Sequence, residues 1–260
     1  MYKEENMTEF YGYGEKKICL VTGGGRGIGA SITQRLAKLG YRVVINYFNS
    51  EIQSVHLAKG LIHSGFEALT IQADVSNKNQ VDAMFARIED TWGAVDCLIN
   101  NAGVSLHKML VDSGEEEWRH IMDTNLKSVY LCSKRAMPAM MAKRWGRVVN
   151  IASVWGITGA SCESIYAASK GGMIAFSKSL ASEYGAYGIT VNTIAPGIVE
   201  TDMIRNSLSR RELQDLVDEI PAARLGKTDD VAAACGYFLS SGAEFVNGQV
   251  LSIDGGWKIT

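Results

Sequence analysis

Residues 17–29 read KICLVTGGGRGIG, and this stretch decides the fold. Its apolar first half is typical of a buried strand, and the glycine-rich turn that follows leads directly into a helical pattern. Glycine lets the backbone turn sharply and approach a pyrophosphate, which then meets the N–H groups and positive end of the helix. Such a turn alone is a weak signal, but its place between a first strand and a first helix predicts dinucleotide binding. The expected nucleotide contacts in this stretch are Gly23, Gly25, Arg26, Gly27, Ile28 and Gly29.

Strand-like and helix-like segments alternate along the rest of the chain. The predicted strands are 17–22, 42–47, 67–73, 97–100, 146–151, 190–195 and 249–253. The predicted helices are 28–39, 77–91, 115–140, 166–184 and 228–239, with Thr228 as the cap of the last. The strands are apolar without clean alternation, as in parallel strands covered on both faces. This pattern predicts one doubly wound, Rossmann-type α/β domain over residues 17–260, with a parallel sheet of about seven strands.

Composition and charge narrow the function. The net charge of −2 over 260 residues gives no support for binding nucleic acid or an anionic membrane. No apolar run reaches the ~18 residues that span a bilayer, and residues 1–16 are polar and acidic, which predicts a flexible extension without a secretory signal. Five scattered cysteines indicate a reducing, cytoplasmic location. The four histidines have no ligand spacing, so no metal site is predicted; His107 either faces the substrate or lies at the surface.

The end of the second predicted strand bears on the choice between NADP(H) and NAD(H). An acidic residue there would bind the ribose 2′-OH, but the chain reads Tyr47-Phe48-Asn49-Ser50. Arg26 offers a planar fork to a 2′-phosphate, with Tyr47, Asn49 and Ser50 as neutral neighbours. NADP(H) is therefore the expected cofactor. Two observations leave NAD(H) open: Arg26 is equally a solvated loop charge, and Glu51 follows closely.

Two further strand ends carry polar residues. Asp74-Val75 follows the third predicted strand, and Asn101-Ala102-Gly103 follows the fourth. Open α/β sheets bind ligands at the carboxyl ends of their strands, so these residues are expected to line the nucleotide site. Because Asp, Asn and Gly are also common turn formers, each pair alone is consistent with a simple turn.

Tyr166 and Lys170 lie four residues apart, on one face of a predicted helix. A free tyrosine has a pKa near 10, and a neighbouring ammonium is expected to lower it toward neutral pH. Ser153 follows the fifth predicted strand and can reach Tyr166 from there. Asn125 lies within a predicted helix, where asparagine is mildly unfavourable, which suggests a role for its amide.

Together these motifs resemble the short-chain dehydrogenase/reductase family, as do Pro196-Gly197, Thr201-Asp202-Met203 and the ending Ile253-Asp254-Gly255-Gly256. The resemblance implies that Tyr166 protonates a carbonyl oxygen while the nicotinamide delivers hydride, and that Ser153 hydrogen-bonds the same oxygen. It implies that Lys170 holds the nicotinamide ribose and that Asn125 anchors a water leading to Lys170. It also adds four nucleotide contacts: Pro196, Gly197, Ile198 and Thr201.

Within that family the chain is most similar to 3-oxoacyl-[acyl-carrier-protein] reductases and acetoacetyl-CoA reductases, on residues 43–51, 146–156, 161–163 and 188–203. This implies NADPH-dependent reduction of a 3-oxoacyl thioester in fatty acid biosynthesis by a homotetramer. Such enzymes meet the acidic carrier protein through basic residues near the active-site mouth. Lys143, Arg144 and Arg147 match one such cluster, but Tyr187 stands where arginine is common. A solvated helix end explains Lys143 and Arg144 equally well.

Several alternatives stay open. The chain is otherwise a dehydrogenase of a free alcohol, steroid or sugar, or a non-catalytic NADP-binding redox sensor, against which the complete set of catalytic residues argues. The amphipathic segment 200–223 is expected to be a substrate lid, although a surface helix pair fits almost as well. Trp155 either lines the substrate pocket or belongs to the core.

Overall fold

The computed structural model describes residues 16–201 and 210–258, and its centre is a parallel sheet of seven strands. The strand order is β3-β2-β1-β4-β5-β6-β7, which confirms the doubly wound fold. The strands are β1 (Ile18–Val21), β2 (Arg42–Tyr47), β3 (Ala68–Gln72), β4 (Cys97–Asn100), β5 (Gly146–Ile151), β6 (Ile189–Pro196) and β7 (Val250–Ile253).

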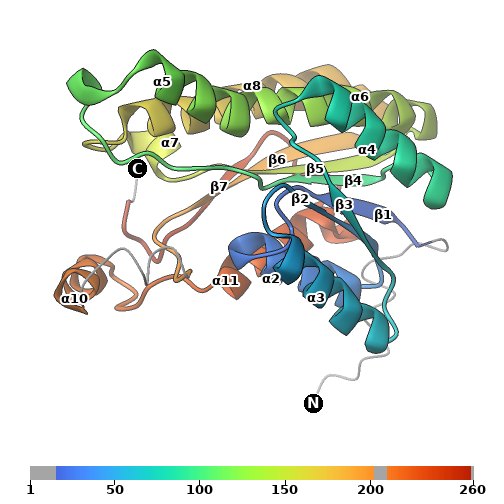
Figure 1. Ribbon diagram of the computed structural model, residues 1–260, viewed down its shortest axis with the longest axis horizontal. Helices are drawn as coiled ribbons and strands as arrows, with labels where there is room; N and C mark the ends of the chain where they lie inside the picture. Colours follow the sequence, from blue (N-terminus) through green and yellow to red (C-terminus); the bar gives the residue numbers. More distant parts are fainter. Residues whose placement is uncertain (1–15, 202–209, 259–260) are drawn as a thin grey trace.

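Helices cover both faces of the sheet, with α4, α5, α6 and α8 on one side and α2, α3 and α11 on the other (Figure 1). The α-helices are α2 (Gly27–Lys38), α3 (Glu51–His63), α4 (Lys78–Thr91), α5 (Glu115–Met122), α6 (Ser128–Lys143), α7 (Trp155–Thr158), α8 (Ser164–Tyr184), α10 (Arg210–Glu219) and α11 (Thr228–Leu239). A π-helical turn, η3 (Asp123–Lys127), joins α5 to α6, and short 3-10 turns are η2 (Leu110–Asp112), η4 (Gly185–Tyr187) and η5 (Ser241–Ala243).

The hydrophobic core has two halves, one on each face of the sheet. Phe85 of α4 and Met140 of α6 pack in one half, and Ile32 of α2 and Phe238 of α11 pack in the other. All four side chains are buried. Strands covered on both faces explain why their sequences are continuously apolar rather than alternating.

The order of the strands places the candidate site. The chain moves outward from β1 to β2 and β3, and then returns to add β4 on the other side of β1. Ligands of open α/β sheets bind where the order reverses, beyond the carboxyl ends of the strands. The glycine-rich turn after β1 and the residues after β4 meet at this reversal.

Most predicted elements are confirmed, with shifts of one or two residues at some ends. The predicted helix 115–140 is instead divided by the π-helical turn η3. The expected cap Thr228 was wrong: Lys227 is the capping residue, and the Asp230 carboxylate accepts a hydrogen bond from its backbone N–H. Helices α3 and α7 were absent from the prediction.

Some expectations fall on residues that the structure does not describe. Residues 1–15 of the predicted extension and residues 202–209 of the predicted lid lie outside the described ranges. The described remainder of the lid segment contains α10, and Ala222 donates a backbone hydrogen bond to Gly255 of the C-terminal tail. No helix within the described part of the chain is long and apolar enough to cross a membrane.

Candidate active site

The glycine-rich turn between β1 and α2 is packed too closely for side chains. A Cβ added at Gly29 would lie 2.2 Å from the carbonyl oxygen of Gly23, and one at Gly25 would lie 1.9 Å from Ser54 Oγ. Gly23 and Gly27 have φ values of +60° and +51°, which glycine adopts without strain. Helix α2 starts at Gly27, has no acidic residue in its first turn and receives no side-chain cap from Arg26. Its free N–H groups and positive end therefore fit a pyrophosphate.

Side-chain amides hold this turn in place from two directions. Asn101 Nδ2 donates to the carbonyl oxygens of Thr22 (2.9 Å) and Gly23 (3.1 Å). Asn46 Oδ1 accepts from Gly23 N, while its Nδ2 donates to Ala73 O at 3.0 Å. Asn46 and Thr22 were absent from the predicted site, although a polar residue in an otherwise apolar strand end was a signal for Asn46. Both residues position the turn rather than face solvent, because both are buried.

The residues expected to choose between the two cofactors gather at the end of β2. Arg26 and Asn49 are exposed, and Ser50 is partly buried, next to the start of α3. Tyr47 is buried, and burial raises its pKa, as does the nearby charge of Glu51; Arg87 of α4 lowers it. Phe48 is exposed between Tyr47 and Asn49. Residues 47–50 at the end of β2 include no basic side chain. The glycine-rich turn supplies a cation instead, Arg26.

The remaining predicted nucleotide contacts come from β3, β4 and β6. Asp74 Oδ1 accepts two hydrogen bonds from Ser76, and Val75 is buried. Ala102 N donates to Thr22 Oγ1, which brings the segment after β4 against the glycine turn. Thr201 lies beside the same turn, because a Cβ on Gly27 would be 3.7 Å from its methyl group. The structure thus brings these segments together, along with Gly103, Pro196, Gly197 and Ile198 at the carboxyl edge.

Ser153 lies beside Tyr166, close enough for its hydroxyl to act on the pKa of the phenol. Ser153 follows β5, and its Oγ also accepts from Trp155 N at 3.2 Å. Tyr166 lies in the first turn of α8. Burial raises the pKa of Tyr166 to about 12, although the Ser153 hydroxyl lowers it; the charge of Glu163 raises it further. The phenol therefore stays protonated across the neutral range.

Lys170 lies one turn beyond Tyr166 on α8 and is buried. Its Nζ donates to the carbonyl oxygen of Ile151 at 2.8 Å and lies 5.8 Å from the Tyr166 ring centre. Burial lowers the pKa of Lys170 to about 8. The sequence led us to expect a Tyr166 pKa below its ordinary value, lowered by Lys170, but the pKa of Tyr166 is raised, because burial outweighs the effect of Ser153. The Lys170 Nζ points toward the backbone carbonyl of Ile151.

Asn125 lies in the π-helical turn η3 and is fully buried. Its Oδ1 accepts from Val104 N, and its Nδ2 donates to Val104 O and to Ser169 Oγ. Both amide hydrogens are therefore used within the protein. Of the side-chain atoms, Oδ1 alone retains an acceptor position for a water. The amide ties the loop after β4 to α8, next to Gly103 and Lys170.

A second polar pair lies beside Tyr166. Glu163 is the capping residue of α8, and its Oε1 lies 3.9 Å from Nδ1 of His107. His107 belongs to the loop after β4, and its side chain is exposed. In the sequence analysis Glu163 appears only as the last residue of the stretch 161–163, so its proximity to Tyr166 is a finding of the structure.

The basic cluster lies at the other end of the sheet. Arg144 precedes β5, whereas Ser153 follows it, and six strand residues span about 20 Å. Arg147 is buried against Trp145, and Lys143 is paired with Asp96 at 2.7 Å. The expectation that all three surround the active-site mouth of their own chain was wrong, since strand direction separates them from it.

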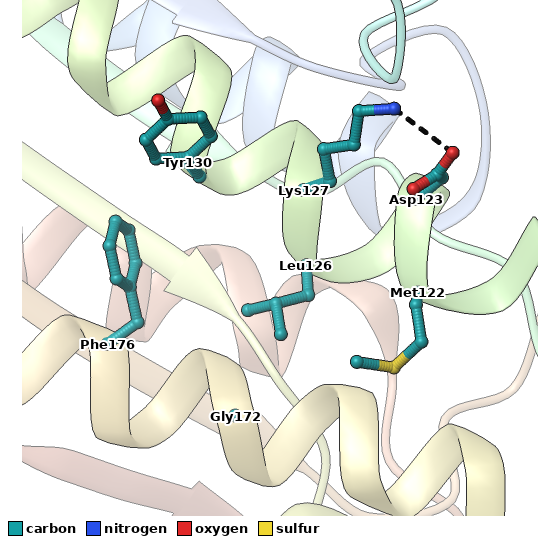
Figure 2. Close-up of a pocket in the computed structure, with 7 residues that line it drawn as sticks. All are labelled: Met122, Asp123, Leu126, Lys127, Tyr130, Gly172 and Phe176. Atoms are coloured by element: carbon teal, nitrogen blue, oxygen red, sulfur yellow. Dashed lines mark hydrogen bonds and ion pairs between the residues drawn. The ribbon is translucent and has the colours of Figure 1, made fainter. Parts of the chain in front are cut away.

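An apolar hollow of about 440 Å³ lies on the outer side of the helix layer formed by α6 and α8. It is lined by Met122, Asp123, Leu126, Lys127, Tyr130, Gly172 and Phe176. Figure 2 shows Leu126 directed toward Gly172 of α8, and Lys127 paired with Asp123 along its own helix. None of these residues belongs to the predicted nucleotide or catalytic set. In the described ranges, no group of three His, Cys, Asp or Glu residues could hold a metal ion.

Comparison with known proteins adds to this geometry. Residues 23–258 match the family described as enoyl-(acyl carrier protein) reductase. The chain is 37% identical to 3-oxoacyl-[acyl-carrier-protein] reductase FabG of Staphylococcus aureus strain Mu50, over 92% of this chain and 97% of that protein. It is 40% identical to the enzyme of the same name from Escherichia coli strain K12, over 93% and 97%.

Among solved structures, the fold is similar to that of "a putative gluconate dehydrogenase" from Agrobacterium tumefaciens. The TM-score is 0.89 at 29% identity, and the match covers 93% of this chain and 95% of that chain. This similarity therefore supports the doubly wound fold independently of the sequence motifs.

Proposed function

The chain belongs to the short-chain dehydrogenase/reductase family, and on that premise we propose that it reduces a 3-oxoacyl thioester to the 3-hydroxyacyl form with NADPH. It is an oxidoreductase, and its family uses a nicotinamide cofactor. The observation that carries the proposal is that Ser153 lies close enough to Tyr166 to act on the pKa of its phenol, with Lys170 one turn away, at the sheet edge that also holds the glycine turn.

The bound nicotinamide supplies hydride to the carbonyl carbon. Tyr166 donates its phenolic proton to the carbonyl oxygen, and its raised pKa keeps that proton available. Ser153 donates a hydrogen bond to the same oxygen, where negative charge develops. Lys170 is buried on the nucleotide side, next to Gly103, and is proposed to hold the ribose.

Asn125 takes a positioning role in this scheme. Its amide fixes the loop after β4 against α8, and so fixes Gly103 relative to Lys170. The proposed water on the path to Lys170 then rests on Oδ1 or on the backbone of the π-helical turn, since both amide hydrogens are engaged.

Three features support NADPH as the reductant. Residues 47–50 at the end of β2 include no carboxylate, Arg26 is exposed at the start of α2, and Asn49 and Ser50 add neutral donors. A 2′-phosphate needs a cation nearby, which Arg26 can provide. The FabG names of the relatives support the thioester as substrate class.

The position of the basic residues favours a second candidate. Tyr187 replaces an expected arginine, and Arg147 and Lys143 are engaged inside the chain. Arg144 donates to Ala186 O and lies far from Ser153 of its own chain. A reductase of a free hydroxylated ketone needs no carrier dock, and a similar solved structure bears the name of a sugar-acid dehydrogenase. A non-catalytic nucleotide sensor fits less well, because the Ser153–Tyr166–Lys170 set is complete.

We further propose a homotetramer, an acyl-carrier partner, a cytoplasmic location, and a substrate lid over residues 200–223. The exposed aromatic side chains of Trp118 in α5 and of Tyr130, which lines the hollow of Figure 2, support contact between copies through α5 and α6. Light scattering behind a sizing column tests the assembly. A monomer at micromolar concentration would contradict it.

The deciding experiment presents one acetoacetyl group on acyl-carrier protein and, separately, on CoA, and measures NADPH oxidation. A clearly larger kcat/KM for the carrier form supports fatty-acid elongation and a docking role for Arg144. Poor rates with both forms would contradict the thioester assignment, and free ketones with NADPH and NADH would then be compared.

A further inference from the structure

Glu163 and His107 form a polar pair at the reaction centre that the mechanism above does not use. Glu163 Oε1 lies 3.9 Å from His107 Nδ1, and the charge of Glu163 reaches Tyr166 strongly enough to raise its pKa. Tyr166 follows three positions after Glu163, at the start of the same helix. The pair therefore borders the place where a substrate carbonyl meets the phenol.

The surrounding backbone holds this pair in place. Cys162 adopts the left-handed region with φ +61°, and its carbonyl oxygen accepts a 2.6 Å hydrogen bond from Lys108 N. Lys108 in turn binds the carboxylate of Glu117 at the start of α5. These contacts fasten the loop after β4 to the segment before α8, so that His107 and Glu163 face each other from two walls of the site.

The Glu163 carboxylate has acceptor capacity left over. Its side chain is only 21% exposed, and within the described ranges His107 is the one side chain paired with it. An ionised carboxylate has two oxygens and about four acceptor positions. Burial raises the pKa of Glu163, and His107 opposes that rise only in part. A partly desolvated carboxylate is stabilised by any hydrogen-bond donor that a substrate brings.

We propose that Glu163, oriented by His107, selects carbonyl substrates that carry a hydroxyl group next to the carbonyl carbon. The inference rests on the proposed roles of Tyr166 and Ser153 as the reaction centre and on the second candidate function, reduction of a free hydroxylated ketone, since a 3-oxoacyl thioester carries no hydroxyl next to its keto carbon. On the Ser153 side, the ring of Trp155 packs edge-on against Trp257 with ring centres 5.0 Å apart. An apolar aromatic wall with a few convergent polar groups is the usual composition of a small-molecule site.

The test uses a matched pair of ketones, hydroxyacetone and butanone, which differ by a hydroxyl in place of a methyl group. NADPH oxidation is measured with each ketone for the wild type, Glu163→Gln and Glu163→Asp. The wild type is expected to prefer hydroxyacetone, and Glu163→Gln is expected to reduce the ratio of the two kcat/KM values at least tenfold. Glu163→Asp keeps the charge and should keep part of the preference.

Two controls separate selection from damage. Glu115→Gln removes another nearby carboxylate, paired with Arg119 on the exposed side of α5, and should leave the ratio unchanged. NADPH fluorescence titration checks that each variant still binds nucleotide. Equal rates with the two ketones, turnover of neither, or an unchanged ratio in Glu163→Gln would overturn the inference. The thioester rates decide the proposed function separately, since they do not enter the ratio.

Discussion

The nucleotide half and the reaction half of the site are built in different ways. Around β1, β2 and α2, backbone groups and missing side chains create the surface: Gly25 and Gly29 have no room for a Cβ. Around β5 and α8, desolvated ionisable side chains create it: Lys170 is buried, and Tyr166 and Glu163 are partly buried on the same helix and its start. The nucleotide half therefore depends on close packing of the backbone, and the reaction half depends on the charges of desolvated side chains.

This difference shows where each half is vulnerable. A methyl group is enough to damage the nucleotide half, because the glycine turn touches its own backbone. The reaction half stores unfavourable electrostatic free energy, because a buried ammonium loses its hydration. Substitutions in the two halves should therefore differ in the sign of their effect on stability.

The largest effect on nucleotide affinity is expected from Gly29→Ala. Its Cβ would lie 2.2 Å from Gly23 O and 2.6 Å from Asn101 Nδ2, so the turn must open. We expect nucleotide affinity to fall on the order of 100-fold, and the free energy of unfolding to fall by roughly 2 kcal/mol. Fluorescence titration and urea unfolding measure the two quantities.

Gly60→Ala is the matched control for that variant. Gly60 lies in α3 with no atom within 4 Å of an added Cβ, so alanine should bind nucleotide normally and raise helix stability slightly. If Gly29→Ala behaved like Gly60→Ala, close packing would not define the nucleotide half.

Lys170→Met tests the other half, with the opposite sign for stability. The pKa of Lys170 is about 8 in the folded chain, below its ordinary value of 10.5, so folding opposes its charged form. Near pH 7 the methionine variant should be more stable by roughly 2 kcal/mol, while turnover is lost. Thermal unfolding at several pH values measures the change.

The pH dependence of the wild type follows from the same group. Between about pH 8 and 10.5 the unfolded chain binds the proton that folded Lys170 has released, so the contribution of Lys170 to stability rises with pH across this window. The gap between Lys170→Met and the wild type should close there. Reductive kcat/KM should decline above about pH 8, as Lys170 loses its charge. A constant gap from pH 7 to pH 10 would contradict the buried, desolvated state of Lys170.

The two halves also differed in how far the sequence predicted them. Glycines before Gly29 and polar residues after strands are local signals, so the nucleotide half was largely predictable. In the reaction half, the sequence identified Ser153, Tyr166 and Lys170 as candidate residues, but it did not predict the direction of the pKa shifts of Tyr166 and Lys170. The pKa of Tyr166 depends on its burial and on where the Lys170 ammonium points. The four-residue spacing of the two side chains gives neither.

Other misses have similar causes. Arg144 was placed near the active-site mouth by resemblance, although strand direction puts it at the opposite end of β5. Helix α3 shows little amphipathic pattern, because only a few of its residues, such as Ser54, Ala58 and Leu61, are buried. Asn46 and Glu163 act through contacts with distant segments; the polar residue at the end of an apolar strand was a local signal for Asn46, but nothing local marked Glu163.

The smallest effect is expected from Arg26→Gln. Arg26 is exposed and its side chain makes no capping hydrogen bond to α2, so the free energy of unfolding should change by less than about 0.5 kcal/mol. The preference for NADPH over NADH should fall by about tenfold, because a solvent-screened cation near a phosphate contributes about that much. Comparing kcat/KM for the two cofactors measures it. An unchanged preference would make Arg26 a solvated loop charge.

The most direct test of the division between the two halves is Tyr166→Phe, assayed for both nucleotide binding and ketone reduction. Removing one oxygen should lower kcat by about 1,000-fold, because the phenol is the proton donor of the proposed mechanism, while the Kd for NADPH stays within about twofold. Retained turnover would contradict Tyr166 as the proton donor. A parallel loss of NADPH affinity would contradict the separation of shape and charge between the two halves.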